Sequence, residues 1–331
     1  MHLHRLDPDN LDRRDVDAVT AVWEMARAAD APDDLSLTES SVRTTLARGW
    51  ELNPPRTALL RDGRGRPVGV LDLHLSRYDN HHVADVGVTV EPSARRQGIG
   101  RRLFEAGVEQ AMADGRTLIT ASCRDDGPGV GFAKAMGLDR ASEEVRRTQD
   151  LWALDRDRLE ALAGEAAGHH ADYDIVPIGY PTPERLLGPI AVLTAAINDA
   201  PTDDLEVDDE VFTPERVRAF EQSQFAYDRR MYRLVARHRG TGELAGQTVV
   251  VIPARQPWFA HQLDTSVVRA HRGRRLGLAL KIAMVRELVQ SEPQVRTLET
   301  WNAASNDHMI AVNEALGYRV MGRVIDWQKR V

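Results

Sequence analysis

Residues 88–103 read VTVEPSARRQGIGRRL, and this stretch decides the interpretation of the sequence. A β-branched run ends at Val90, a turn rich in arginine and glycine follows, and a helical pattern begins near Gly98. The open amide groups of a helix N-terminus attract anions, and glycine lets a phosphate approach the backbone. The stretch therefore predicts a strand, a turn and a helix that can hold a diphosphate. The alternative is an ordinary glycine turn with surface arginines.

Two common phosphate-binding motifs do not fit this turn. Leu103 stands where the dinucleotide fingerprint has its third glycine. The Gly-Lys-Ser/Thr of a P-loop does not follow. The turn is therefore neither a dinucleotide fingerprint nor a P-loop.

The pattern returns in the second half of the chain, where residues 265–280 read TSVVRAHRGRRLGLAL. Gly69 and Gly246 lie in matching segments at the same offset as these two stretches, and Gly137 matches Gly317 at nearly that offset. Near-constant offsets over distant landmarks predict two copies of one domain. We expect an N-terminal domain at 1–152, a linker at 153–172 and a C-terminal domain at 173–331.

Each half shows the same order of elements. Hydrophobic periodicity and turn residues predict two helices, three strands, a long helix and a strand, followed by a closing helix and strand. In the first half the helices lie at 11–29, 38–48 and 98–113, and the strands at 57–61, 67–75, 83–90 and 117–122. In the second half the helices lie at 183–198, 214–223 and 276–290, with strands at 232–236, 244–252, 260–268 and 295–301. Thr182 and Thr213 are expected as helix caps.

The expected fold class is α+β. The strand–helix–strand portion of each half predicts a parallel pair joined by a right-handed crossover. The remaining strands are expected to be antiparallel. Each domain should therefore contain a mixed, mostly antiparallel sheet flanked by helices.

Composition excludes several classes of protein. The 331 residues carry a formal net charge of −7, which argues against a protein that mainly neutralises nucleic-acid phosphates. Cys123 is the single cysteine, so an internal disulfide and a multi-cysteine zinc site are excluded. Neither a signal-peptide core nor a run of about 20 apolar residues is present. We expect a cytoplasmic protein without nucleic acid, membrane or catalytic metal. Basic residues are nearly all arginine, as in GC-rich bacterial genomes.

The turn resembles the signature of the GNAT superfamily of acyl-CoA-dependent N-acyltransferases, which is Arg/Gln-x-x-Gly-x-Gly/Ala. Residues 95–100, Arg-Arg-Gln-Gly-Ile-Gly, fit it fully. Residues 272–277 fit with one departure, because Arg275 stands where the first glycine is expected. Residues 306–318 resemble the family element that follows the fifth strand, and Asn306 can cap the helix of that element. The resemblance covers both halves and extends to tandem members similar to mycothiol synthase.

The resemblance implies acetyl-CoA, or another acyl-CoA, held between two splayed parallel strands. The implied cofactor-binding residues of the first half are Val90, Arg95, Arg96, Gln97, Gly98, Ile99, Gly100 and Arg101. Those of the second half are Val267, Arg272, Gly273, Arg274, Arg275, Leu276, Gly277, Asn302, Asn306 and Asn313. Asn313 and, in the first half, Ala133 replace the tyrosine that relatives often use as general acid. A general acid is therefore not identified.

Two carboxylates of the second half are candidate general bases. Asp264 lies in the predicted fourth strand and Glu299 in the fifth, and either could deprotonate an amine directly or through water. The alternative for each is a solvated sheet-edge residue. Other candidates near these strands are His261, His308 and, in the first half, Asp85, His81 and His82. Tyr318 is expected in the core.

An acidic run links the first two helices of the second half and includes Asp203, Asp204 and Glu206. In GNAT-like domains this region borders the acceptor site, and an acidic rim would concentrate a cationic amine. The alternative is an ordinary solvated loop. We expect direct acetyl transfer to a small cationic primary amine in the C-terminal half. The expected assembly is a monomer with an internal pseudo-dimer of domains.

Two other functions remain open. A non-catalytic acyl-CoA sensor or scaffold is compatible with the missing tyrosine in both halves. An oxidoreductase of the Rossmann type is less compatible, because its fingerprint and its parallel βαβ series are lacking.

Overall fold

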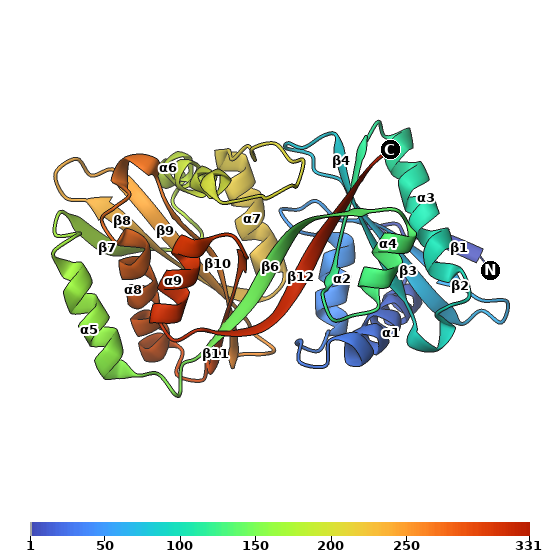
Figure 1. The fold of residues 1–331 in the computed structure, drawn as a ribbon, viewed down its shortest axis with the longest axis horizontal. Coiled ribbons are helices and arrows are strands. Elements are labelled where there is room, and N and C mark those ends of the chain that lie inside the picture. The colour runs from blue at the N-terminus through green and yellow to red at the C-terminus, as the bar shows by residue number, and fades with distance from the viewer. Residues whose placement is uncertain (1) are drawn as a thin grey trace. The chain divides into compact units, whose positions relative to one another are not determined.

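The computed structural model describes residues 2–331 and contains two compact units (Figure 1). The first unit contains the chain up to Ser142, together with Asp203–Asp209 and Val324–Val331. The second contains Glu143–Thr202 and Glu210–Arg323. Each unit is thus assembled from separated stretches of the chain, whereas the sequence repeat predicts continuous domains at 1–152 and 173–331.

The first unit is built on a mixed sheet with strand order β1-β2-β3-β4-β5-β12. Its strands are β1 (His2–Arg5), β2 (Arg56–Arg61), β3 (Pro67–His74), β4 (Val83–Val90), β5 (Leu118–Arg124) and β12 (Arg319–Arg330). Only β4 and β5 pair in parallel among these described strands. Helices α1 (Arg13–Asp30) and α2 (Glu39–Ala47) pack on one face, and α3 (Ile99–Ala113) and α4 (Gly129–Ala135) pack on the other.

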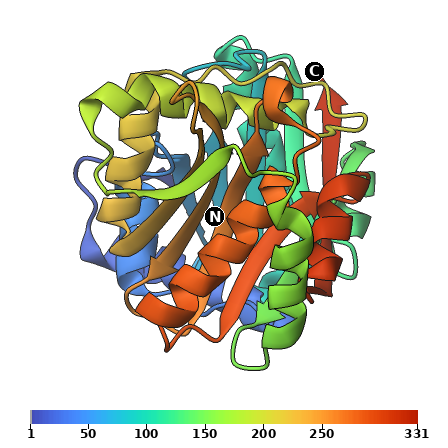
Figure 2. The same ribbon diagram turned by 90° about the vertical axis from the view of Figure 1, so that its left-hand side faces the viewer.

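The second unit repeats this plan with strand order β7-β8-β9-β10-β11-β6. Its strands are β7 (Tyr173–Ile178), β8 (Arg229–His238), β9 (Leu244–Pro253), β10 (Phe259–Val267), β11 (Thr297–Ala303) and β6 (Asp139–Asp150). Helices α6 (Glu184–Ala195) and α7 (Pro214–Ala226) pack on one face. Helices α5 (Arg156–Ala167), α8 (Leu276–Ser291) and α9 (Asp307–Ala315) pack on the other (Figures 1 and 2). The predicted α+β class with mostly antiparallel sheets is confirmed.

The closing strands of the two halves are exchanged. The sequence predicts that each half ends with a strand of its own sheet, and this prediction is wrong. β6 follows the last helix of the first half and pairs with β11, from Asp150 opposite Thr297 to Glu144 opposite Ala303. β12 ends the chain and pairs with β5. Two copies of one domain offer the same sheet edge to the same strand, so the repeat pattern cannot distinguish the two pairings.

Local signals placed most elements correctly. The predicted long helices at 98–113 and 276–290 are α3 and α8 within one residue. Thr213 caps α7 by accepting the amide of Arg216, as expected. Thr182 does not cap α6, because its hydroxyl bonds Glu221 in the interior instead.

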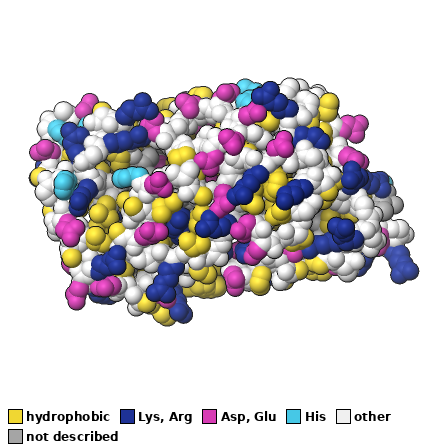
Figure 3. Space-filling view, in the orientation of Figure 1, with side chains coloured by type: hydrophobic (Ala, Val, Ile, Leu, Met, Phe, Trp, Pro, Cys, Tyr) yellow, Lys and Arg dark blue, Asp and Glu magenta, His cyan; other side chains and the backbone are white. Residues whose placement is uncertain are grey.

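Charges of both signs are interspersed over the face that Figure 3 shows, so that face carries no extended basic stripe. Among residues 2–331, we find no helix with the length and hydropathy of a membrane span.

Candidate functional site

The turn between β4 and α3 of the first unit leads into a helix whose first amides have no side-chain cap. β4 ends at Val90, a short 3₁₀ turn spans Pro92–Ala94, and α3 begins at Ile99. Gly98 precedes the helix with φ +79°, and it provides no side-chain cap for the first amides. A Cβ added to Gly98 would meet nothing within 4 Å. The turn therefore offers the donors and the space that a phosphate needs.

The second unit repeats this turn in the same frame. The left-handed residues of the first turn are Arg96 and Gly98, and the matching residues of the second turn, Gly273 and Arg275, are left-handed too. Arg275 immediately precedes α8 and likewise provides no side-chain cap. The structure thus confirms that Arg275 takes the place of Gly98. Holding an arginine in the left-handed region costs about 1 kcal/mol.

Arg95 and Arg272 hold the turns in place through hydrogen bonds to other parts of the protein. The Nε of Arg95 donates to the carbonyl of the last β4 residue at 3.1 Å, and its guanidinium group bonds both oxygens of Asp30 at 2.8 and 2.7 Å. Arg272 donates to the last β10 carbonyl at 3.0 Å and to Asp199 at 2.6 Å. These donors are engaged within the protein, so both arginines position the turn. Other turn side chains are exposed: Arg96, Gln97, Arg101 and Arg274.

A fork opens between the two parallel strands of each unit. β4 pairs with β5 from Val83 to Asp85, although β4 continues to Val90. β10 pairs with β11 from Phe259 to His261, although β10 continues to Val267. Beyond these pairs the neighbouring strands diverge, as the resemblance implied for an acyl-CoA cleft. We call the divergent parts the first fork and the second fork.

Of the two forks, only the second contains a β-bulge among the described strands. The pairing of β10 with β9 shifts between Gln262 and Thr265, whereas β4 pairs regularly with β3. β10 has 9 residues and the matching β4 has 8, so the bulge contains one inserted residue. A bulge leaves the extra residue out of the ladder and redirects side chains, and it often occurs next to active sites.

The bulge turns Asp264 toward α6 and α7. Leu263 packs on this side against the buried cluster of Met231, Val249 and Val251, and Asp264 accepts from Gln247 at 2.5 Å and from Ser266 at 3.1 Å. Two consecutive side chains therefore lie on one face, where a regular strand would alternate. Burial raises the pKa of Asp264 to about 7, although the two donors lower it. A carboxyl group with this pKa can exchange a proton near neutral pH.

Three buried polar atoms near Asp264 have no partner in the structure. They are Asp264 Oδ1, Gln247 Oε1 and Arg233 Nε, from three adjacent strands of the second unit. Buried polar atoms are normally hydrogen-bonded, so such a group needs a water or a ligand. The two oxygens can only accept, which suits a donor such as an amine.

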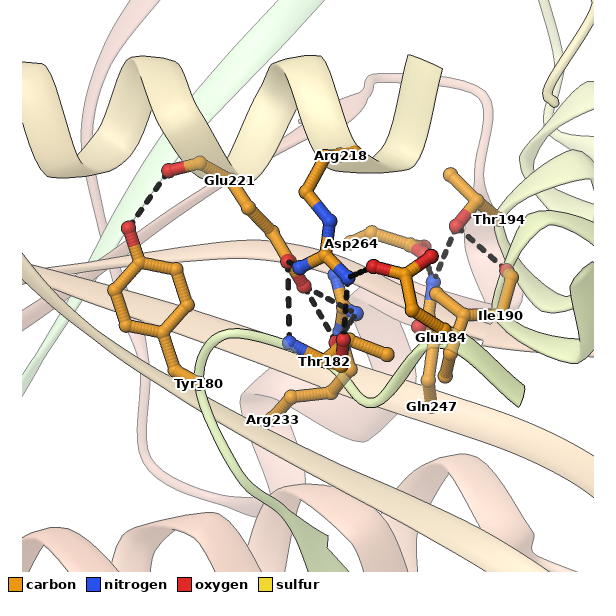
Figure 4. A network of polar contacts seen from close by, with 10 residues as sticks. All are labelled: Tyr180, Thr182, Glu184, Ile190, Thr194, Arg218, Glu221, Arg233, Gln247 and Asp264. Atoms are coloured by element: carbon orange, nitrogen blue, oxygen red, sulfur yellow. Dashed lines mark hydrogen bonds and ion pairs between the residues drawn. The ribbon is translucent and has the colours of Figure 1, made fainter. Parts of the chain in front are cut away.

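A buried ion-pair network lies beside this group (Figure 4). Glu221 of α7 is 1% exposed and accepts from Arg218 at 2.7 Å and from the amide of Thr182 at 3.1 Å. Arg233 of β8 donates to the Thr182 hydroxyl at 2.9 Å and lies 3.3 Å from Glu221. The network fastens α7 and the start of α6 to β8 and fixes the positive charge that faces Asp264.

Glu299 is held in an ion-pair cluster. It is 5% exposed, pairs with Arg146 of β6, and lies 3.0 Å from His261 Nδ1. Its pKa is lowered: burial alone would raise it, but His261 and Arg146 outweigh that effect. A carboxylate so strongly paired is a weaker proton acceptor than Asp264. Glu299 lies opposite His261 in the last parallel pair before the second fork, and a catalytic role for it stays a prediction.

The asparagines of the second half lie around β11 and α9. Asn306 caps α9 by accepting the amide of Met309 at 3.2 Å, as predicted. Asn313 is fully buried and donates to Asn302 Oδ1 at 2.6 Å, at the splayed end of β11. Contact of these residues with a cofactor stays a prediction.

The acidic loop at 203–209 belongs to the first unit. The amide of Glu206 donates to Gln328 Oε1 at 2.9 Å, and its carboxylate pairs with Arg330. The amide of Asp204 donates to the carbonyl of Ala141 at 3.0 Å. These contacts indicate a fastening role on the first unit. An acceptor role for Asp203, Asp204 and Glu206 stays a prediction.

The first unit places its carboxylates differently. Gly87 occupies the position of Asp264, and the opposite residue of β3 is Asp72. Asp72 accepts from Thr57 at 2.7 Å, and burial raises the pKa of Asp72 to about 6. Burial also raises the pKa of Asp85, which accepts from Thr120 at 3.1 Å. Both units thus hold acids of raised pKa, but only the second places one in a bulge.

Sequence reasoning missed the buried polar residues of the second unit, notably Arg233, Glu221, Gln262 and Lys281. One signal was available: Lys281 interrupts an otherwise apolar helix face in a chain with only three lysines.

Among residues 2–331, no group of three or more His, Cys, Asp or Glu side chains could hold a metal ion.

Known proteins share this sequence pattern and this architecture. A model of the acetyltransferase (GNAT) family matches residues 22–138. A structure described as a tandem GNAT protein from the clavulanic acid biosynthesis pathway, without AcCoA, superposes with a TM-score of 0.79. It is 29% identical, and the match covers 99% of this chain and 98% of that one. Residues 22–138 thus match the GNAT family, and the whole chain is similar to a tandem GNAT protein.

Curated relatives of this chain match over part of their length. Mycothiol acetyltransferases from Stackebrandtia nassauensis and Clavibacter michiganensis are each 30% identical, over 151 and 128 residues. The matches cover 45% and 38% of this chain, and less than half of the relatives' own length, namely 46% and 39%. A GCN5-related N-acetyltransferase from Sphaerobacter thermophilus shares the fold, with a TM-score of 0.69 at 17% identity over 99% of this chain and 95% of that one.

Proposed function

We propose that this chain is an N-acetyltransferase that moves an acetyl group from acetyl-CoA directly to a primary amine, with the chemistry in the second unit. One observation carries the proposal. The bulge of β10 puts Asp264, a carboxyl group whose pKa burial raises to about 7, just beyond the point where β10 parts from β11. The first fork has glycine at this position.

Both turns fit the diphosphate of an acyl-CoA. Each presents an uncapped helix N-terminus, α3 after Gly98 and α8 after Arg275, with exposed arginines around it. The amides and the helix dipole would hold the phosphates, and Arg95 and Arg272 would keep each turn in shape. When bound in the second fork, acetyl-CoA supplies an activated acyl carbon.

Asp264 would act as the general base. An ammonium group gives one proton to Asp264, directly or through water, and the freed electron pair forms the new C–N bond. The C–S bond breaks, and the second proton on nitrogen goes to the departing sulfur. Asp264 then releases its proton to solvent. The balance leaves an amide, a thiol and one proton, so the reaction needs no further reactant.

The bulge would also supply hydrogen-bond donors. The extra residue of a bulge leaves the strand ladder, so its backbone amide is available to a ligand. A donor aimed at the carbonyl oxygen of a thioester stabilises the negative charge that develops there, and removal of one such donor costs about 10²–10³ in kcat. The backbone at Leu263 and Asp264 is the candidate.

A small cationic amine suits the acceptor side. Asp264 Oδ1 and Gln247 Oε1 are buried oxygens without partners, and both would accept hydrogen bonds from an ammonium group. The names of the mycothiol acetyltransferases and of the clavulanic acid pathway protein are compatible with a small-molecule acceptor.

Kinetics of Asp264→Asn test the proposal. With acetyl-CoA and the best amine from a panel, we expect kcat to fall about 10²–10⁴-fold, since the amide cannot accept the proton. Asp72→Asn removes the buried acid of the first unit and is the matched control, for which we expect kcat within about twofold. Equal effects of the two variants would contradict a second-unit site.

A non-catalytic acyl-CoA sensor is the second candidate, and Asn313 favours it. Its side-chain amide does not titrate and stands where relatives often have a tyrosine. Calorimetry with acetyl-CoA, run beside the amine panel, separates the candidates. Binding without turnover of any amine would establish the sensor and overturn the enzyme.

A further inference from the structure

The core between α8 and β10 is polar, whereas its counterpart in the first unit is apolar. Matching positions of the two units are all buried or partly buried. The first unit has Leu71, Val86, Val88, Phe104 and Leu138 at these positions, and the second has Thr248, Gln262, Thr265, Lys281 and Tyr318. The first unit shows that the same fold forms with apolar residues at these positions. Folding alone therefore does not explain why the second unit has polar residues there.

Lys281 lies at the centre of this polar set. Its ammonium group is 3.0 Å from Gln262 Oε1 and lies over the Tyr318 ring, 5.0 Å from the centroid. The Tyr318 hydroxyl donates to the same Gln262 oxygen at 3.2 Å, and Gln262 Nε2 donates to Thr248 at 2.6 Å. Lys281 itself is 1% exposed.

Lys281 has no counter-ion among residues 2–331. Burial is the only influence found on the pKa of Lys281, which it lowers to about 7. Tyr318 is the other titratable member of the set, and burial raises its pKa well above the usual range. A buried cation without an anion is costly, and the fold does not require it, because Phe104 fills the equivalent place.

The set lies at the second fork. Gln262 is the first β10 residue beyond the last pair with β11, and it begins the bulge. Thr265 ends the bulge, and its hydroxyl is 2.8 Å from that of Thr248 and 3.4 Å from Gln262 Nε2. Gln262 and the two threonines thus hold both ends of the bulge from the α8 side, and Lys281 holds Gln262.

We propose that Lys281 is a positioning residue for acyl transfer: through Gln262 it fixes the bulge, and its positive charge stabilises the negative charge that forms on the thioester oxygen and the departing sulfur in the second fork. This inference rests on the proposed function. The missing counter-ion is then an anion that exists only during the reaction, and interactions made only in the transition state raise kcat.

Variants of Lys281 separate this role from a purely structural one. Lys281→Met removes the buried charge, and Lys281→Phe installs the residue of the first unit. We expect kcat to fall about tenfold or more, while the KM for acetyl-CoA stays within about twofold and the Tm is unchanged or higher. Lys134→Met, at an exposed lysine of α4, is the control and keeps wild-type values. A joint fall of kcat and Tm in both Lys281 variants, or an unchanged kcat, overturns the proposal.

A second measurement does not depend on turnover. The chain has three lysines, so labelling with [13Cε]lysine gives three NMR signals, and the one lost in Lys281→Met belongs to Lys281. We expect its titration midpoint to be higher by about one pH unit with S-carboxymethyl-CoA than with S-carboxamidomethyl-CoA, because the first places a carboxylate where the acetyl group would bind and the second is its neutral match. Equal midpoints overturn the inference. A wild-type protein that acetylates no amine but shows the shift would reject the enzyme and retain the charge at the fork.

Discussion

At the scale of single residues, the second unit separates its carboxylates by environment. Asp264 faces α6 and α7 with one unpartnered oxygen, whereas Glu299 lies between Arg146 and His261. Burial dominates at Asp264 and raises its pKa, but the paired cations lower the pKa of Glu299. Carboxyl groups whose pKa values are pushed apart can take different roles in one site.

The free energy of unfolding should depend on pH through the protonation of Asp264. The folded pKa of Asp264, about 7, lies above the unfolded value of about 3.9. Its contribution to stability is therefore fully present below about pH 4 and is lost as pH rises through about 7. Between about pH 5 and pH 8 we expect wild type to lose roughly 2 kcal/mol relative to Asp264→Asn. Urea unfolding at both pH values measures this, and parallel losses in the two proteins would contradict it.

At the scale of elements, the inserted residue of β10 distinguishes the two units. β4 and β10 start and finish at matching positions of their units, yet β10 has one residue more and therefore contains a bulge. The bulge unpairs backbone groups and brings Asp264 to the face of Leu263. A local change in strand length thus creates the proposed site without altering strand order.

Deletion of Leu263 tests this interpretation. The shortened β10 would match the regular β4, and the aspartate would take the place of Leu263 on the same face. We expect kcat to fall about 10²-fold or more, because the unpaired backbone donor is lost while the carboxylate remains. Steady-state kinetics measure the loss, and circular dichroism checks that the fold persists. Wild-type kcat in a folded variant would exclude the bulge from the mechanism.

Sequence reasoning succeeded where the signal was local or repeated. The glycine turns, the long helices and the Asn306 cap follow from short patterns. The bulge escaped because its only trace is one extra residue in the second copy of a single strand. Gln262 was missed because it lies in a strand pattern that predicts only burial, and the lysine that interrupts the apolar face of α8, Lys281, was not recognised as a signal. The identity of their polar partners depends on tertiary packing.

At the scale of the whole molecule, the exchange of β6 and β12 makes each unit depend on both halves of the chain. β12 covers the β5 edge from Arg124 to Leu118, and β6 covers the β11 edge. An uncovered edge exposes unpaired backbone groups and invites aggregation. Neither sequence half is therefore expected to be stable alone.

Removal of residues 324–331 should destabilise β5, which lies about 200 residues earlier in the chain. We expect amide hydrogen exchange to accelerate at least about tenfold in β5, because its hydrogen-bonded neighbour is lost. β11 keeps its partner β6 and serves as the internal reference, with protection unchanged. Exchange followed by mass spectrometry measures both segments. Equal acceleration in β5 and β11 would indicate general unfolding instead.

The same strand exchange affects synthesis. The first unit cannot complete its sheet until Val324–Val331 has left the ribosome, although most of the unit is translated by Ser142. At roughly 5–20 residues per second, the nascent unit waits on the order of 10–40 s with the edge of β5 uncovered. The first unit is thus expected to complete its sheet only after most of the chain has been made, and the yield of the protein in the cell should depend on whatever shields the edge of β5 during the wait.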